Sequence, residues 1–324
     1  MKIKKEFIIL VAVIIALSAY LFLHESDRTH YQLPAVPEIA GTDITRLEIS
    51  KGDRTIRLIH KDNKWYVDPD QYLADAPKVN TMIKAVGSLT LTALVSEAES
   101  YGRYDLDPDS RITVKAWGKD ALSREMEIGK AAGTQQHTFV KLPGDKNVYH
   151  ARGNFRRAFD LSVDDLRDRG VLSFDRNDIR EVRITKAGDS IVLNRRQIPE
   201  ETAAEVADKD KDKESKPPVA GQTVWEYAEG KTADKGQLNA LLGDLSGLNC
   251  QAYINGRGKQ DYTNPLYTLM FKGDQEYVLS IFDKLKPEDT AYPAVSSQND
   301  FPFTLSDYSV DDMKKKIDEL LKKD

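Results

Sequence analysis

The chain has 324 residues, of which 40% are apolar and 31% are charged, and it contains a single cysteine. This length suits two ordinary globular domains, and the composition is too polar for a multi-span membrane protein. Basic and acidic residues number 47 and 52, so no excess of positive charge indicates nucleic acid as a partner. Cys250 alone can form neither an intramolecular disulfide nor a cysteine-based metal knuckle.

The amino terminus has the pattern of a membrane anchor. Residues 7–23 carry no charge, and three lysines precede them. At a rise of about 1.5 Å per residue, a helix of this length covers roughly 25 Å, near the lower limit for crossing a bilayer. The charge bias predicts a single-pass membrane protein with a cytoplasmic amino terminus and the bulk of the chain outside the cytoplasm.

These features predict a transmembrane anchor over residues 1–24, followed by a short extended stalk over 25–41. A cleaved signal peptide is the competing interpretation. The best cleavage signal, Ala16-Leu17-Ser18, is followed by further apolar residues, which favours an uncleaved anchor.

The rest of the chain shows an internal duplication. Asp43–Lys51 matches residues 178–186 at a shift of 135, and Trp65 matches Trp225 at a shift of 160. Further matches in the same order join the helical pattern at 79–89 to 238–248 and Ser-Val-Asp-Asp at 162–165 to 309–312. Collinear matches predict two tandem repeats, over residues 42–175 and 176–324. The alternative is that any alternating strands followed by an amphipathic helix look alike.

The second repeat carries a charged insertion. The shift between matched residues rises from 135 to 160 along the chain. This rise requires roughly 25 extra residues between the matched strands. Residues 199–219, rich in Asp, Lys, Glu and Ala, supply them. Such a composition cannot bury a core, so we expect this segment to be disordered, either as a solvated loop or as a partner-binding tail.

Each repeat is predicted to contain strands, a helix, further strands and a closing helix. In the first repeat the early strands alternate apolar and polar residues, and residues 76–89 carry an apolar stripe of helical period. The links between strands are too short for crossover helices. The predicted fold class is therefore α+β: an N-terminal transmembrane helix followed by two tandem repeats of mostly antiparallel sheet with packed helices.

No catalytic, cofactor or metal site is readable from the sequence. The five histidines lack zinc-protease spacing, and the glycines near Lys130 do not form a phosphate-binding loop. Asp105, Asp107 and Asp109 alternate like calcium ligands, but the rest of the calcium-loop pattern is missing. We therefore expect a protein without enzymatic activity, metal or small-molecule cofactor.

Aromatic residues near the middle of each repeat suggest a surface for a partner. Trp65 and Trp225 fall at equivalent strand positions and are expected in the core. Tyrosines lie close to Asp107-Pro108 and Asn264-Pro265. The candidate partner surface therefore comprises Tyr104, Asp107, Tyr262 and Asn264.

Four segments resemble a known family. They are Lys64-Trp65-Tyr66 followed by the 79–89 helix, Tyr104-Asp105-Leu106-Asp107-Pro108, and Leu166-Arg167-Asp168-Arg169 before Val171-Leu172. Together they resemble the bacterial domain of unknown function 4340 family, over residues 43–324 as two copies. The resemblance implies one amino-terminal segment in the inner membrane, with the bulk of the chain in the periplasm. It also implies an accessory role beside gliding-motility-type ABC transporter subunits. It implies no catalytic residues, and the charged insertion is a departure from the family pattern.

Three functions follow as hypotheses. The first is a membrane-anchored, extracytoplasmic accessory or binding protein, bound to the membrane through residues 7–23 and associated with an ABC-type export complex. The second is a cell-envelope carbohydrate-binding module, or an enzyme of unknown reaction, that uses the region of Tyr104 and Asp107. The third is a passive spacer tethered to the membrane.

Overall fold

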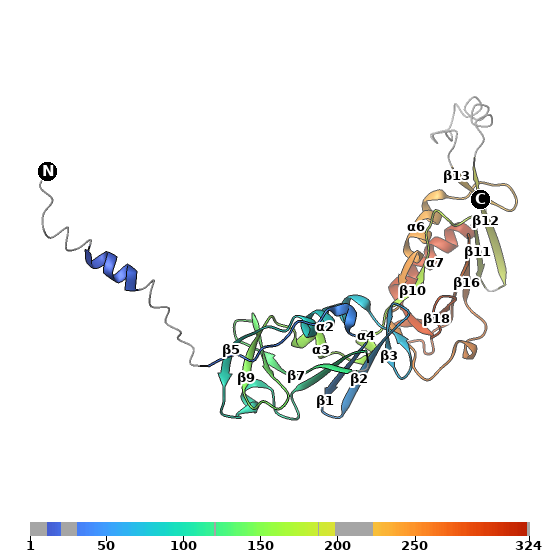
Figure 1. The fold of residues 1–324 in the computed structure, drawn as a ribbon. Coiled ribbons are helices and arrows are strands. Elements are labelled where there is room, and N and C mark those ends of the chain that lie inside the picture. The colour runs from blue at the N-terminus through green and yellow to red at the C-terminus, as the bar shows by residue number, and fades with distance from the viewer. Residues whose placement is uncertain (1–11, 21–30, 120, 187, 198–222, 323–324) are drawn as a thin grey trace, which may run out of the picture. The chain divides into compact units, whose positions relative to one another are not determined.

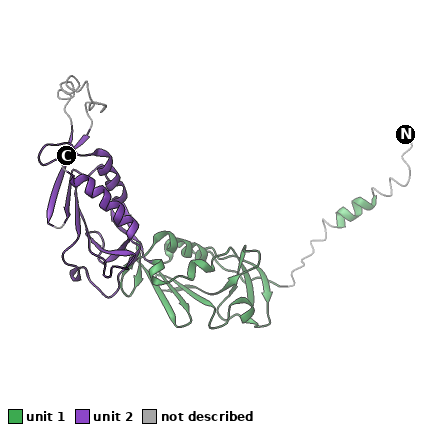
Figure 2. Cartoon of the chain, turned by 180° about the vertical axis from the view of Figure 1, so that it is seen from behind, with its two compact units in different colours: residues 1–166 green, residues 167–324 purple. Residues whose placement is uncertain are grey.

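The computed structural model describes residues 12–20, 31–119, 121–186, 188–197 and 223–322 (Figure 1). The chain divides into two compact units, Met1–Leu166 and Arg167–Asp324, which Figure 2 colours separately. We refer to them as unit 1 and unit 2. The charged segment 199–219 lies outside the described residues.

Unit 1 is built on one antiparallel sheet of nine strands. Their order is β4-β3-β2-β1-β6-β7-β8-β9-β5. The strands are β1 (Arg46–Lys51), β2 (Arg54–Lys61), β3 (Lys64–Asp68), β4 (Tyr72–Leu73), β5 (Leu91–Ser96), β6 (Ile112–Gly118), β7 (Ala121–Ala131), β8 (His137–Lys141) and β9 (Val148–Arg152). Alternation buries one side chain in two along β1, β2, β3 and β6, so one face of this sheet needs a cover.

Helix α2 (Ala76–Gly87) contributes to that cover. It begins where the Asp75 carboxylate accepts the Lys78 amide at 3.0 Å, with a proline in the first turn. Its buried stripe is Val79, Met82, Ile83 and Val86, which belong to the same core as the sheet. The other helical segments of unit 1 are η1 (Gly41–Asp43), η2 (Tyr101–Tyr104), α3 (Arg156–Phe159) and α4 (Val163–Leu166).

The described part of the segment expected as a stalk packs on this core. Leu33, Val36 and Ile39 lie against the buried cluster, and the Ile39 amide donates to the Gly87 carbonyl at 3.0 Å. Its apolar residues are therefore covered by unit 1, at the carboxyl end of α2.

Unit 2 has an eight-stranded antiparallel sheet and a separate two-stranded one. The large sheet has the order β13-β12-β11-β16-β17-β18-β19-β15, and β10 pairs with β14. The strands are β10 (Gly170–Ser173), β11 (Glu181–Lys186), β12 (Asp189–Gln197), β13 (Thr223–Tyr227), β14 (Gly247–Asn249), β15 (Ala252–Tyr253), β16 (Tyr267–Lys272), β17 (Glu276–Ile281), β18 (Ala291–Ser296) and β19 (Phe303–Ser306). The helical segments are α6 (Lys235–Leu245), η3 (Lys259–Asp261) and α7 (Asp307–Leu321).

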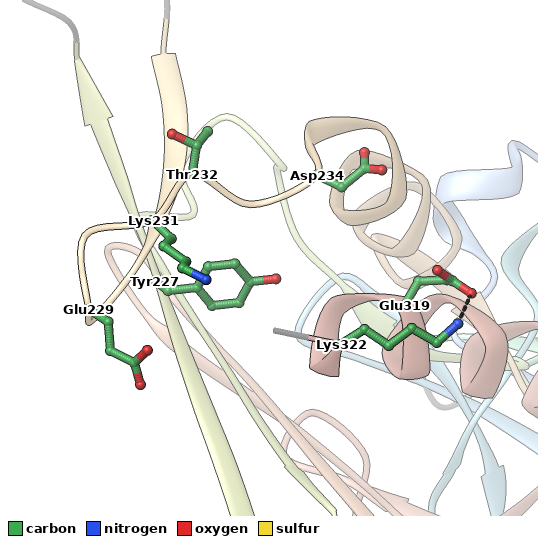
Figure 3. A pocket seen from close by; sticks show the side chains of 7 residues that line it. All are labelled: Tyr227, Glu229, Lys231, Thr232, Asp234, Glu319 and Lys322. Carbon is green, nitrogen blue, oxygen red and sulfur yellow. Dashed lines mark hydrogen bonds and ion pairs between the residues drawn. The ribbon is translucent and has the colours of Figure 1, made fainter. Parts of the chain in front are cut away.

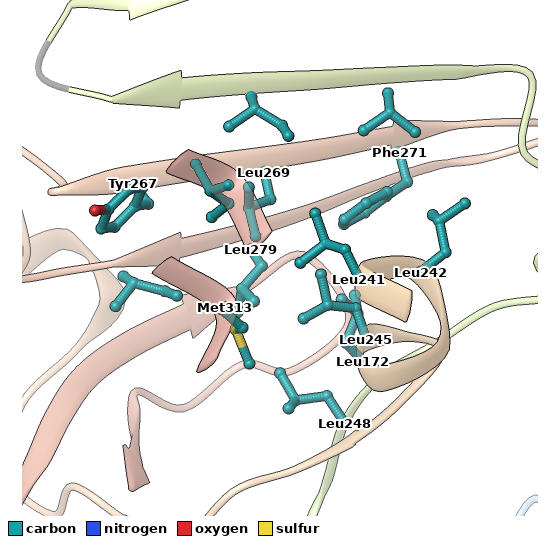
Figure 4. Close-up of a cluster of buried hydrophobic side chains, with 14 of the residues drawn as sticks. Leu172, Leu241, Leu242, Leu245, Leu248, Tyr267, Leu269, Phe271, Leu279 and Met313 are labelled. Carbon is teal, nitrogen blue, oxygen red and sulfur yellow. The ribbon is translucent and has the colours of Figure 1, made fainter. Parts of the chain in front are cut away.

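The core of unit 2 lies between this sheet and the two long helices. Figure 4 shows leucines of α6 and Met313 of α7 facing Leu269, Phe271 and Leu279 of the sheet. The Ser306 hydroxyl caps α7 by accepting the Ser309 amide at 3.2 Å.

The two units share one strand order. Omitting β4, the unit 1 order β3-β2-β1-β6-β7-β8-β9-β5 corresponds strand by strand to that of unit 2. The first hairpins also share a register, because Leu47 pairs with Leu58 as Val182 pairs with Leu193, each displaced by 135 residues. Positions can therefore be matched between the units.

The structure corrects the transmembrane part of the predicted fold class. A helix is described over residues 12–20, and residues 7–11 and 21–23 of the predicted span lie outside the described residues. No helix in the described part of the chain is long and apolar enough to cross a membrane. The prediction of a transmembrane helix over residues 7–23 is therefore wrong, whereas the mostly antiparallel sheet agrees with the structure.

Candidate partner-binding site

The structure brings two of the four predicted surface residues together. Tyr262 and Asn264 line one pocket of about 280 Å³ in unit 2, between η3 and β16. We call it the Tyr262 pocket. Its lining residues are Arg257, Asp261, Tyr262, Thr263, Asn264, Phe282, Asp283 and Leu285. Tyr104 and Asp107 belong to unit 1 and do not line this pocket.

Local turns place Tyr262 and Asn264 in the pocket wall. The Gly258 amide donates to the Asp261 carboxylate at 2.7 Å, which closes the 3-10 turn before Tyr262. Asn264 has a φ of +60°, a conformation that asparagine tolerates better than most residues. Leu266 then rejoins the sheet, since its amide donates to the Ile281 carbonyl at 2.8 Å.

The inner wall of the Tyr262 pocket is aromatic. The rings of Tyr262 and Phe282 lie 5.3 Å apart between centroids and are tilted by 52°. Phe282 is nearly buried, and its amide donates to the Pro293 carbonyl at 2.9 Å. The Tyr262 hydroxyl oxygen is buried and has no hydrogen-bond partner among the described residues.

The outer rim is formed by the segment after β17. Leu285 is 58% exposed, whereas most leucines of unit 2 are buried. The neighbouring Lys284 ammonium donates to the Asp307 carboxylate at 2.9 Å and lies 5.1 Å from the Tyr292 ring. Its hydrogen bond to Asp307 raises the pKa of Lys284. The contact ties this segment to the start of α7 and holds Leu285 at the pocket mouth.

The two unit 1 residues make structural contacts instead. The Tyr104 ring packs on Phe139, with centroids 4.8 Å apart. The Asp107 carboxylate accepts the Ser110 amide at 3.1 Å and so closes the turn before β6. Burial alone would raise the pKa of Asp107, but hydrogen bonds from Ser110 and from neighbouring amides outweigh it and lower that pKa. This geometry gives both residues a role in local folding.

A histidine pair that the sequence interpretation missed lies beside Tyr104. The rings of His137 and His150 stack at 5.3 Å, and Phe139 lies 4.9 Å from His150. The His150 Nε2 atom is buried without a hydrogen-bond partner among the described residues. Burial, and then the neighbouring His137, lower the pKa of His150. The sequence gives no signal for this pair, because His137 and His150 lie on separate strands, β8 and β9.

A second pocket of unit 2, of about 230 Å³, is dominated by charged side chains (Figure 3). Its lining residues are Tyr227, Glu229, Lys231, Thr232, Asp234, Glu319 and Lys322. Lys322 pairs with Glu319 at 2.7 Å, and the Tyr227 hydroxyl donates to the Leu320 carbonyl at 2.8 Å. Burial and the charge of Asp234 raise the pKa of Tyr227. Three acidic and two basic side chains line this pocket, so it has no strong excess of either charge.

Over the described ranges, no group of three or more His, Cys, Asp or Glu side chains is placed to hold a metal ion. The Tyr262 pocket combines an aromatic wall, an apolar rim and polar side chains. Such a lining suits an apolar side chain or ring flanked by polar groups.

Comparison with known proteins gives one match. A family model described as a domain of unknown function (DUF4340) matches residues 65–267. No curated protein and no solved structure matches the chain.

Proposed function

The chain belongs to the DUF4340 family, and from this premise we propose that it is a binding protein that recognises a protein partner through the Tyr262 pocket. The observation that carries the proposal is the exposed Leu285 beside the Tyr262–Phe282 ring pair. An apolar residue held at the mouth of an aromatic pocket offers area that a partner side chain can bury.

The polar rim supports recognition of a polypeptide. Arg257 carries a positive charge and Asp283 a negative one on the same pocket lining. Charges around an apolar centre give specificity and orientation, while the centre supplies most of the affinity. The resemblance of the chain to its family suggests a subunit of an ABC-type export complex as this partner. The extracytoplasmic location expected from the sequence stays a prediction.

Site-specific crosslinking tests the proposal. A photo-reactive phenylalanine analogue replaces Leu285 in the full-length protein, and the same analogue replaces Leu122, which is 50% exposed in unit 1, as a matched control. We expect position 285 to crosslink in cells to a defined protein that position 122 does not capture. Equal capture from both positions, or none from position 285, contradicts the proposal.

The crosslinked protein is then purified and its affinity measured. We expect Leu285→Asp to weaken binding at least about tenfold, because it places a charge where an apolar contact forms. Leu122→Asp, with the same change of chemistry, is expected to leave binding unchanged. If both variants bind like the natural protein, the Tyr262 pocket is not the interface.

Carbohydrate binding is the second candidate, because polar side chains line the same pocket beside the rings. Thr263, Asn264 and Asp283 offer hydroxyl, amide and carboxylate groups that could bind sugar hydroxyls. Soluble cell-envelope glycan fragments titrated by calorimetry test this function. Saturable binding that Asp283→Ala removes would favour it over the protein partner, and absence of heat would reject it.

A further inference from the structure

A different cavity of unit 2 collects positive charge. It has a volume of about 370 Å³ and lies at the start of α6, beside β12, β13 and the loop before β11. Its lining residues are Asp175, Arg176, Asn177, Arg195, Thr223, Trp225, Lys235, Asn239 and Leu242. Three of these are cationic and one is acidic. We call it the Arg176 cavity, and we propose that it binds the oxyanion group, phosphate or carboxylate, of a small ligand.

The acidic member does not neutralise the cations. The Asp175 carboxylate accepts the backbone amide of Asn177 at 2.8 Å, which holds the turn before β11. Arg195 donates one N–H to the Asn177 carbonyl at 2.5 Å, and a guanidinium carries five donors in all. The side chains of Arg176 and Lys235 make no hydrogen bond or ion pair with another residue that the structure describes. Several donors therefore remain for a ligand.

Other polar groups in the cavity are also able to donate. Thr223 carries a hydroxyl and Asn239 a side-chain amide, and both line the same space. Trp225, 4% exposed, closes the inner side with Leu242. Low-dielectric walls on one side of a group of cations strengthen their attraction for an anion.

The fold itself does not require these cations, because unit 1 lacks them at the matching positions. The Asp43 amide donates to the Ala40 carbonyl as that of Asp178 donates to Asp175, so Gly41 matches Arg176. At this position unit 1 places a glycine against the Ile83 side chain.

Unit 1 also lacks a matching cation for Arg195 and for Lys235. The His60 amide donates to the Thr45 carbonyl as that of Arg195 donates to Arg180, so His60 matches Arg195. Ala76 and Lys235 each begin a helix directly after a capping aspartate. At three matched positions, unit 1 has uncharged or weakly basic residues where unit 2 has cations. This difference favours a ligand-binding role for the three cations of unit 2.

The size of the cavity limits the ligand to a compact molecule or a single anionic group. Arginine forms paired, charge-assisted hydrogen bonds with either a phosphate or a carboxylate. Phosphorylated and carboxylated ligands share the chemistry that the Arg176 cavity recognises, so the test uses one probe for each class. Inorganic pyrophosphate represents phosphorylated ligands and citrate represents carboxylated ones.

Calorimetric titration of the full-length protein at low ionic strength tests the proposal. We expect saturable binding of at least one probe, weakened about tenfold or more in the double variant Arg176→Gln/Lys235→Gln. These two side chains make no hydrogen bond or ion pair with a described residue, so the double variant keeps the described hydrogen bonds of the fold. Lys315→Gln removes a positive charge from the exposed side of α7 and serves as the control.

Each outcome decides the proposal. Stronger binding of pyrophosphate assigns the cavity to phosphorylated ligands, and stronger binding of citrate assigns it to carboxylated ones. Failure of both probes to bind overturns the proposal. Equal weakening by Lys315→Gln also overturns it, since binding would then follow total charge. Neither result bears on the Tyr262 pocket, whose lining shares no residue with the Arg176 cavity.

Discussion

Arg124 is the buried cation on which unit 1 depends most directly. It is 8% exposed, and its guanidinium donates to the carbonyls of Val86, Gly87 and Pro37. It thereby joins β7, the end of α2 and the segment before β1. Burial lowers the pKa of Arg124.

Replacing Arg124 by methionine should therefore destabilise unit 1. The variant leaves three carbonyls without this donor, and we expect a loss of about 2–3 kcal/mol. Hydrogen exchange of the peptides around residues 33–39 and α2 in the full-length protein measures it. Arg57→Met, which removes an exposed ion pair to Glu48, should change exchange by less than about 0.5 kcal/mol. Equal effects of the two variants would contradict the role given to Arg124.

We expect His150 to make unit 1 sensitive to mild acid. Its pKa is lowered in the folded state, first by burial and then by His137, so the unfolded chain binds a proton more readily. The stability that a neutral His150 contributes is therefore complete above a pH of about 6.5 and declines as the pH falls below that value.

The variant His150→Phe keeps an aromatic ring beside Phe139 and cannot take up a proton. We expect protection of β8 and β9 amides in the natural protein to fall more between pH 7.5 and pH 5.5 than in this variant. Hydrogen exchange of both proteins, corrected for the intrinsic pH dependence, gives the comparison. An identical loss of protection in the two proteins would show that His150 does not titrate in this range.

Single residues show where sequence interpretation reaches its limit. The pattern around Tyr262 and Asn264 pointed to a surface, and the structure places both on one pocket. Nothing in the sequence indicated Phe282 or Leu285 as their neighbours, because that contact joins segments separated by a strand hairpin. The burial of Arg124 could not be predicted either, because one charged residue in an alternating strand does not indicate which face of the sheet it lies on.

Among the structural elements, two glycines show how closely the turns approach the sheet. A Cβ at Gly118 would lie 2.7 Å from the Asp43 carbonyl oxygen, and one at Gly273 would lie 2.5 Å from that of Asp178. Both are backbone atoms that cannot rotate away. The same close approach thus recurs at matching positions of unit 1 and unit 2.

Gly273→Ala should therefore weaken the pairing of β11 with β16. The displaced turn is expected to cost about 1–3 kcal/mol, measured by hydrogen exchange of these two strands. A Cβ at Gly247 would meet no atom within 4 Å, and the φ of this residue lies outside the left-handed region. Gly247→Ala is therefore the control and should be near neutral. A neutral Gly273→Ala would show that the turn has room to move.

Elements with strong periodicity were predicted well. The apolar stripe at 76–89 corresponds to α2, which the structure ends at Gly87, and alternation located the early strands of each unit. The apolar composition of residues 7–23 led to the prediction of a transmembrane helix, whereas no helix in the described part of the chain is long and apolar enough to cross a membrane.

At the scale of the whole chain, two units with one strand order carry different surfaces. Unit 1 uses the residues near Tyr104 and Asp107 for packing and turn formation. Unit 2 has the Tyr262 pocket and the Arg176 cavity on its own sheet and helices. Repeated architecture with divergent side chains is how one fold supports separate functions. The proposed partner binding therefore belongs to unit 2.

The most direct measurement is a hydrogen-exchange footprint of the full-length protein with and without its crosslinked partner in purified form. Binding through the Tyr262 pocket predicts added protection at residues 257–266 and 281–286, and none at 101–111 of unit 1. Protection confined to unit 1, or absent from both segments of unit 2, would contradict the assignment of partner binding to this pocket.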